Sequence, residues 1–176
     1  FAETGITVVS GLAFGCDVAA HEGCLAAGGR TVAVLAHGLQ SIHPRAHRMI
    51  AHRMVDEGGC LVSEYPVGTE VQRYYYVERD RLQSALSRAV VIVETDIEGG
   101  TMHTFQAAEN QGRAVYCLAP RDQEKSCAST NGTQRLLAEA KADPLANSDD
   151  MQMLIDRVCC TNLPTDESVS RTGESG

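Results

Sequence analysis

Short apolar runs alternate with amphipathic stretches along the first 141 residues of the chain. The apolar runs predict strands near residues 6–10, 31–36, 60–64, 89–94 and 114–119. The stretches between them predict helices near residues 17–27, 44–57, 79–87, 101–111 and 132–141. Strands that alternate with helices form a parallel sheet with helices on both faces. The pattern therefore predicts a three-layer α/β domain with a mainly parallel sheet of about five strands.

Two of these runs, Thr31–Leu35 and Ala89–Val93, lack the polar alternation of a half-exposed strand. Strands of this kind have helices over both faces, so we expect both to be central in the sheet. Gly28, Gly58 and Gly112 fall where helices should end. Glycine readily adopts the left-handed conformation that ends many helices.

The chain divides by charge and composition into a domain over residues 1–141 and an acidic tail over residues 142–176. The tail holds seven acidic and two basic residues, and so carries five of the eight net negative charges. In the tail, Asp143-Pro144 should stop the preceding helix, residues 151–158 predict one short helix, and the polar end beyond 163 predicts disorder. The chain opens at Phe1 rather than Met, so we expect a fragment or a processed form.

The net charge of −8 and the pI near 5.2 argue against a general polyanion binder, so any phosphate contact must be local. No apolar run reaches the roughly 18 residues that span a bilayer, and we expect no membrane contact. The seven cysteines form no CxxC pair and indicate a reducing, cytoplasmic location. Cys16, Cys60 and Cys117 lie in or beside apolar runs, where thiols are usually buried.

Two glycine turns each join a predicted strand to a predicted helix, within residues 10–17 and 94–104. Such a turn directs backbone N–H groups and the positive end of the helix dipole at one point, which favours a phosphate. Thr101 adds a hydroxyl at the second helix entrance. Each turn taken alone is equally consistent with a tight strand-to-helix connection.

Taken together and in order, the segments resemble the DNA-processing protein A family, also called DprA or Smf, whose core is Rossmann-like. The resemblance covers residues 5–120. It rests on Ser10-Gly11-Leu12-Ala13, Gly15, Asp17, Ala19-Ala20-His21, Ala27–Leu35, Gly38-Leu39, Pro44, Ser63-Glu64-Tyr65-Pro66, Gly68-Thr69, Arg79, Arg81, Leu86–Ala89, Val93-Glu94 and Gly112-Arg113.

The resemblance implies binding of single-stranded DNA through its phosphates and help in loading a RecA-type recombinase, in transformation or related DNA handling. It implies no catalysis, no cofactor and no metal ion, and it places a first strand and helix upstream of Phe1. By the family motif, the pocket residues are Ser10, Gly11, Gly15, Arg30, Arg79, Arg81, Gly99, Gly100 and Thr101. We expect the two turns and the three arginines to form one anion site, because each guanidinium group can donate two parallel hydrogen bonds to phosphate oxygens.

The chain departs from the family pattern at four places. The family usually has Arg where this chain has Phe14, Arg-Arg-Asn-Arg where it has Glu78-Arg79-Asp80-Arg81, and Ser-Gly-Ser where it has Gly99-Gly100-Thr101. It also has Pro-Gly where this chain has Pro120-Arg121. The lost cation and the added acids should weaken binding to a polyanion.

Those departures keep two alternatives open. One is a nucleotide-binding or nucleotide-sensing domain, in which Asp17, Glu64 or Glu94 accepts ribose hydroxyls. A phosphoribohydrolase is less favoured, because the turn at Gly99 lacks the second Gly-Thr and the Glu of that family. The other alternative is a partner-binding module in which the pocket is vestigial and a helix face supports self-association, as in a homodimer.

Histidines and tyrosines give weaker signals. The tyrosines at 74–76 either stack on bases or pack against the sheet. His43, His47 and His52 alternate with Arg45, Arg48 and Arg53, which predicts a basic, partly solvated helix rather than a metal site. His21 fits a structural hydrogen bond, and His103 is the one histidine to test in catalysis.

Overall fold

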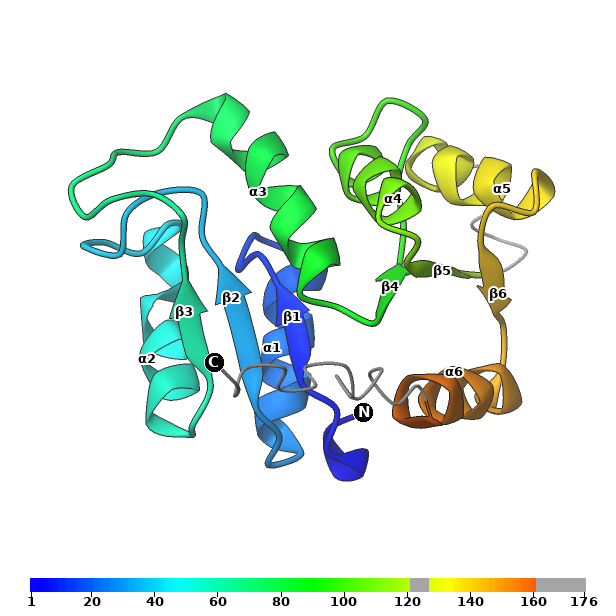
Figure 1. The fold of residues 1–176 in the computed structure, drawn as a ribbon, viewed down its shortest axis with the longest axis horizontal. Coiled ribbons are helices and arrows are strands. Elements are labelled where there is room, and N and C mark those ends of the chain that lie inside the picture. The colour runs from blue at the N-terminus through cyan, green and yellow to red at the C-terminus, as the bar shows by residue number, and fades with distance from the viewer. Residues whose placement is uncertain (121–126, 161–176) are drawn as a thin grey trace, which may run out of the picture.

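The computed structural model describes residues 1–120 and 127–160, and the described chain is an α/β fold (Figure 1). The strands are β1 (Val8–Ser10), β2 (Thr31–Val34), β3 (Cys60–Val62), β4 (Ala89–Ile92), β5 (Ala114–Leu118) and β6 (Asp143–Leu145). The α-helices are α1 (Cys16–Ala26), α2 (Arg48–Asp56), α3 (Arg73–Ala85), α4 (Thr101–Asn110), α5 (Asn131–Ala138) and α6 (Ser148–Cys160). Short 3₁₀ helices are η1 (Ala2–Thr4), η2 (Arg45–His47) and η3 (Ala128–Thr130). None of the helices described in these two ranges is long and apolar enough to cross a membrane.

The strands form two three-stranded sheets rather than one sheet of about five strands. Their orders are β1-β2-β3 and β4-β5-β6, and every pairing is parallel. Across Figure 1 the strands follow the order β3, β2, β1, β4, β5, β6, which is the order of a doubly wound Rossmann sheet. The α/β class and the parallel strands are therefore confirmed, and each inner strand, β1 or β4, is hydrogen-bonded on one side only.

One expected central strand is an edge strand. β2 lies between β1 and β3, as expected, but β4 pairs with β5 alone. Val91 and Val93 are consequently 39% and 43% exposed. An apolar run such as that of β4 therefore does not show whether a strand has hydrogen-bonded neighbours on both sides or on one side only.

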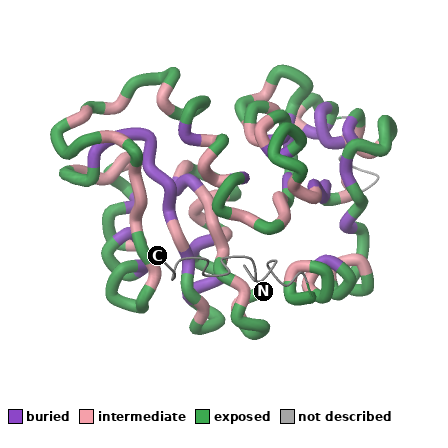
Figure 2. The backbone as a smooth tube through the Cα atoms, in the orientation of Figure 1, coloured by how far each residue is buried: buried purple, intermediate pink, exposed green. Residues whose placement is uncertain are grey.

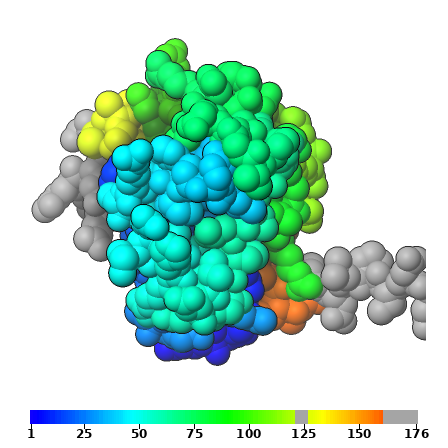
Figure 3. Space-filling model, turned by 90° about the vertical axis from the view of Figure 1, so that its left-hand side faces the viewer, coloured from blue at the N-terminus to red at the C-terminus, as the bar shows by residue number. Residues whose placement is uncertain are grey.

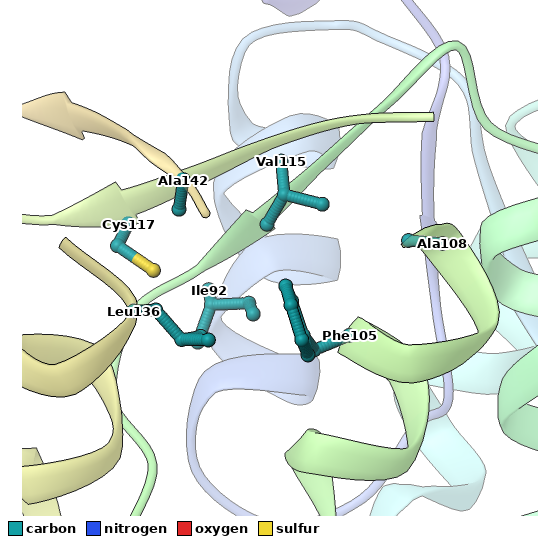
Figure 4. Packing of buried hydrophobic residues seen from close by; sticks show 7 residues of the cluster. All are labelled: Ile92, Phe105, Ala108, Val115, Cys117, Leu136 and Ala142. Carbon is teal, nitrogen blue, oxygen red and sulfur yellow. The ribbon is translucent and has the colours of Figure 1, made fainter. Parts of the chain in front are cut away.

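The sheet of β4, β5 and β6 lies between two helical layers. Side chains alternate along a strand, so Val115 and Cys117 of β5 point to one face and Tyr116 points to the other. The first two pack with residues of α4 and α5, and Figure 4 shows this cluster. Tyr116 packs with Leu145 of β6 and Leu154 of α6. The predicted three layers are present here.

The other sheet packs against α1 and α2. Leu25 of α1 and Met54 of α2 join Ala33 and Leu35 in one buried cluster. Figure 2 shows that the buried positions of this sheet follow β2, while β1 and β3 are intermediate or exposed and the helices turn exposed positions outward. Gly28 and Gly58 end α1 and α2 with φ of 70° and 82°, as predicted.

His21 is fully buried in α1 and joins that helix to the sheet. Its Nδ1 lies 2.6 Å from the Thr31 hydroxyl, which in turn donates to the Val8 carbonyl oxygen over 2.9 Å. Because that hydroxyl has a single proton, His21 Nδ1–H must be the donor. Burial lowers the pKa of His21 from 6.5 to about 4, so the ring is neutral and structural, as expected.

The cysteines differ in part from expectation. Cys117 is buried, and burial raises the pKa of its thiol to about 11. Cys16 and Cys60 are exposed, because each lies at the end of its element rather than inside it. Cys24 on α1 is buried instead.

The residues after 141 form more structure than a helix alone. Asp143-Pro144 does not stop a helix, because α5 has already ended at Ala138, and it lies instead in strand β6. The expected helix at 151–158 is present as the longer α6. The predicted disorder beyond residue 163 lies outside the described residues, and the domain boundary at residue 141 stays a prediction.

Candidate nucleic-acid interface

In a parallel sheet, the segments that follow the strands all begin at the same edge, the carboxyl edge. The turn after β1 and the segment after β2 that leads to η2 begin at this edge of the first sheet, and the turn after β4 begins at this edge of the second. Helix α3 crosses the edge of the first sheet. Arg79 of α3 donates from Nη1 to the carbonyl oxygens of Gly11 (2.9 Å) and Val34 (2.5 Å). One side chain therefore fixes α3 against the ends of β1 and β2.

The turn after β1 is already occupied by a carboxylate of the chain. Ser10 Oγ donates to Asp17 Oδ1 over 2.7 Å, and the backbone N–H groups of Gly11 and Ala13 donate to Asp17 Oδ2 over 3.1 Å each. Asp17 thus takes the place that an external phosphate was expected to fill. The prediction of an external phosphate at this turn is therefore corrected, because the negative charge is the Asp17 carboxylate from the first turn of α1.

Arg79 is a structural residue rather than a free phosphate ligand. It is only 4% exposed, and its Nε also donates to Asp80 Oδ1 over 3.1 Å. Burial raises the pKa of Asp80, although the neighbouring Arg79 acts in the opposite direction. A side chain at Gly11 would collide with Arg79 and Gln83, so the glycine is needed for this contact.

Arg81 lies on the exposed side of α3 and pairs with an acid. Its Nη2 donates to both carboxylate oxygens of Glu64, over 2.6 and 2.8 Å. With 53% of the Arg81 side chain exposed, this ion pair is weak and can open to another anion.

Arg30 is placed at the wrong edge for the expected pocket. It directly precedes β2, whereas Ser10 and Gly11 lie at the end of β1, and the two strands are parallel. Arg30 lines a shallow hollow with Gly58 and Gly59 at the amino ends of the strands. The prediction that three arginines converge on one site is therefore corrected, because the strand separates Arg30 from the other two.

The turn after β4 is open. A side chain at Gly99 would approach Thr95 Oγ1 to 2.5 Å, so only glycine fits there. Gly100 has ordinary helical dihedrals, and a Cβ there would meet no atom within 4 Å. Met102 and His103 donate their N–H groups to the carbonyl oxygens of Gly99 and Gly100. Within residues 1–120 and 127–160 nothing accepts from the N–H groups of Gly100 and Thr101, which begin α4.

Acidic side chains act on one another along this edge. Burial raises the pKa of the Asp80 carboxyl and the Asp17 carboxylate adds to that rise, whereas Arg79 and His103 lower the pKa. Burial raises the pKa of the Cys16 thiol, and the carboxylates of Glu94 and Asp17 raise it further. The edge is therefore more acidic than expected. The described parts of the chain contain no cluster of metal-ligating side chains.

The three tyrosines begin α3 instead of lying in a loop. Tyr75 stacks on Tyr65 with ring centroids 4.1 Å apart, whereas Tyr74 is 57% exposed. Tyr76 lies over the guanidinium of Arg79, 5.8 Å from its centre. Tyr75 thus packs against another ring, as the packing interpretation predicts. Tyr74 and Tyr76 reach solvent, where a ring could stack on a base.

A model of the family described as DNA recombination-mediator protein A matches residues 1–156. The chain belongs to this family. Protein Smf of Escherichia coli (strain K12) is 41% identical over 117 residues, covering 66% of this chain and 31% of the relative. Protein Smf of Synechocystis sp. is 37% identical over 180 residues, covering 93% and 45%. The chain therefore spans about a third to a half of the length of these curated relatives.

Solved structures of the family have the same fold. DNA processing protein A from Streptococcus pneumoniae matches with a TM-score of 0.75 at 28% identity, over 86% of this chain and 52% of that one. The protein from Helicobacter pylori matches with a TM-score of 0.74 at 25% identity, over 87% and 66%. The Helicobacter structure was described for its unique mode of binding single-stranded DNA.

Proposed function

We propose that this member of the recombination-mediator family binds single-stranded DNA, without catalysing a reaction on it, at the entrance of α4. The observation that carries the proposal is the open turn at Gly100 and Thr101, whose N–H groups have no acceptor within the described ranges. The start of a helix attracts a phosphate through such groups and through the helix dipole. Loading of a RecA-type recombinase in transformation, and a homodimer as the loading form, are part of the proposed role.

The proposal replaces the two-turn pocket by a one-turn pocket. Asp17 repels a phosphate at the turn after β1. In the turn after β4, Asp96 accepts from the N–H of Ile97, but no carboxylate of residues 1–120 or 127–160 accepts from the N–H groups of Gly100 and Thr101. Arg81 does not lie at this turn, because its backbone carbonyl accepts from the Gln111 side chain at the opposite end of α4 and its guanidinium pairs with Glu64. The attraction therefore depends mainly on the backbone N–H groups, and affinity should depend only moderately on salt.

The experiment is a fluorescence anisotropy titration of a labelled oligonucleotide at low and high salt, with substitutions at Gly100. Gly100→Glu places a carboxylate in the turn without a steric clash, and an acid at a helix start does not destabilise the helix. We expect Gly100→Glu to lower affinity at least tenfold, and Gly100→Gln to lower it much less.

A matched control is Gly23→Glu, which adds the same charge on α1 at a position that is also free of neighbours. This variant should bind as the wild type does. The proposal fails if the wild type binds no oligonucleotide at low salt, or if Gly100→Glu binds as well as Gly23→Glu.

The acidic edge favours one second candidate, a free nucleotide whose ribose hydroxyls donate to Glu94. Thermal denaturation with a panel of mononucleotides and dinucleotides separates the two. A ligand that binds the folded state raises the melting temperature by mass action. Stabilisation by a nucleotide, with none by an oligonucleotide, would reverse the order of the candidates.

A further inference from the structure

The surface after β2 is basic in an acidic protein. No Asp or Glu lies between Glu22 and Asp56, a segment that contains four arginines and four histidines. Arg45 in η2 and Arg48 at the start of α2 are both exposed. No acidic side chain in the described ranges pairs with either of them, whereas Arg53 on the same helix pairs with Glu57 over 2.6 Å. Figure 3 looks from this side and shows the cyan surface of α2 uncovered next to the green surface of α3.

An exposed aromatic ring lies beside these arginines. Phe14, which follows β1 where the family usually has Arg, is 71% exposed. Its ring meets the His47 ring edge-on, with centroids 4.6 Å apart. Arg45 and Arg48 flank His47 in the chain, so the backbone that carries the two arginines adjoins the residue on which Phe14 packs.

The residues beneath the ring are held in place by hydrogen bonds. His47 is buried, and its Nδ1 donates to the carbonyl oxygen of Leu12 over 2.7 Å. Leu12 is itself fully buried in a left-handed conformation, with φ of 61°. Asp17 fixes the same turn through the N–H of Ala13. The Phe14 ring is therefore exposed on a turn whose neighbouring residues are fixed by hydrogen bonds.

We propose that Phe14, Arg45 and Arg48 form a second contact surface for single-stranded DNA, in which a base stacks on Phe14 and the adjacent phosphates meet the two arginines. Aromatic rings beside cations bind single strands in this way. This inference rests on the proposed function and adds the residues that compensate for the missing family arginine.

The test separates stacking from charge. Anisotropy titrations of the full chain use a thymidine oligonucleotide and an abasic strand of equal length. Phe14→Leu keeps an apolar side chain but removes the ring. We expect it to weaken thymidine binding by about 5- to 100-fold and to leave binding of the abasic strand unchanged. Phe14→Trp should restore the preference for bases.

The charge is tested by the double variant Arg45→Gln, Arg48→Gln. Log affinity falls as log salt rises, and loss of two phosphate contacts should make this negative slope shallower by about 1.4. Arg53→Gln is the matched control, because its cation is already paired with Glu57, and it should leave the slope unchanged.

The outcomes distinguish this inference from the proposed function. If Phe14→Leu and the double variant bind like the wild type while Gly100→Glu loses binding, the second surface is wrong and the proposed function stands. If Phe14→Leu weakens both strands equally, the ring does not stack on bases and the inference is overturned. If the wild type binds neither strand, both proposals fail.

Discussion

Asp17 accepts a hydrogen bond from the backbone N–H of Gly11 over 3.1 Å, and this contact closes the first glycine turn from inside. The same carboxylate also serves Ser10 and Ala13. The turn was expected to bind an external anion, but its donors are already occupied by a carboxylate of the protein itself. The relationship decides which of the two turns can take a phosphate.

Asp17→Ala should destabilise the protein and create an anion site. Three donors lose their charged acceptor, which we expect to lower the free energy of unfolding by about 2–3 kcal/mol. Phosphate or sulfate should then raise the stability of the variant more than that of the wild type, because the freed N–H groups can bind it. Urea denaturation measures both effects, with sodium chloride at equal ionic strength as the control. Equal responses of variant and wild type to phosphate would contradict this account of the turn.

Arg79→Met should act on stability before it acts on binding. The change leaves the carbonyl oxygens of Gly11 and Val34 without their donor and Asp80 without its cation in a buried place. Removal of one partner from such a network costs about 3–5 kcal/mol. Urea denaturation should show this loss. A variant of normal stability that fails to bind DNA would restore Arg79 as a direct ligand.

Stability should fall in mildly acidic solution because of His21. Its pKa is about 4 in the folded protein and 6.5 in the unfolded chain, so between these values the unfolded chain binds more protons. The contribution is fully present above pH 6.5 and is lost as the pH falls towards 4, by up to about 3 kcal/mol. Burial also lowers the pKa of His37, which acts in the same direction.

The pH effect is measured by urea denaturation at pH 7.5 and 4.5. The variant His21→Gln cannot take up the proton, so its stability should change less between the two pH values. An identical change in wild type and variant would assign the effect to other groups, such as His37.

Leu154→Ala should show that α6 is part of the fold. Leu154 is 1% exposed and packs with Tyr116 and Leu145. Truncation of a buried leucine costs about 2–5 kcal/mol. We expect a lower melting temperature, and Met153→Ala, at a position 63% exposed on the same helix, is the control. Equal melting temperatures would mean that α6 is dispensable and that the fold ends near residue 141.

Much of the fold could be predicted from the sequence, because strand and helix patterns are local. The apolar runs placed five strands, and the glycines after α1 and α2 marked helix ends. β6 was missed, since Pro144 in a three-residue strand is a signal for a break. The start of α3 was also missed, because three consecutive tyrosines do not form a helical pattern. The division into two sheets depends on which strands pair, and no local pattern specifies that.

The candidate site was harder to predict, because it depends on partners far apart in the sequence. Arg79 and Arg81 are two residues apart, yet one is buried against strand ends and the other is exposed beside Glu64. Arg30 lies in a family motif but at the opposite end of β2 from the edge. A signal for the role of Asp17 was present, since an acid in the first turn of a helix often accepts from nearby N–H groups. Only the hydrogen bonds of the structure show that Asp17 accepts from the N–H groups of the preceding glycine turn.

The most direct measurement is the set of backbone amide signals in two-dimensional NMR as an oligonucleotide is added. We expect shifts at Gly100, Thr101 and Phe14, with Gly11 and Ala13 little changed because Asp17 holds their N–H groups. Shifts confined to the hollow around Arg30 and Gly59, or no shifts at Gly100 and Thr101, would contradict it.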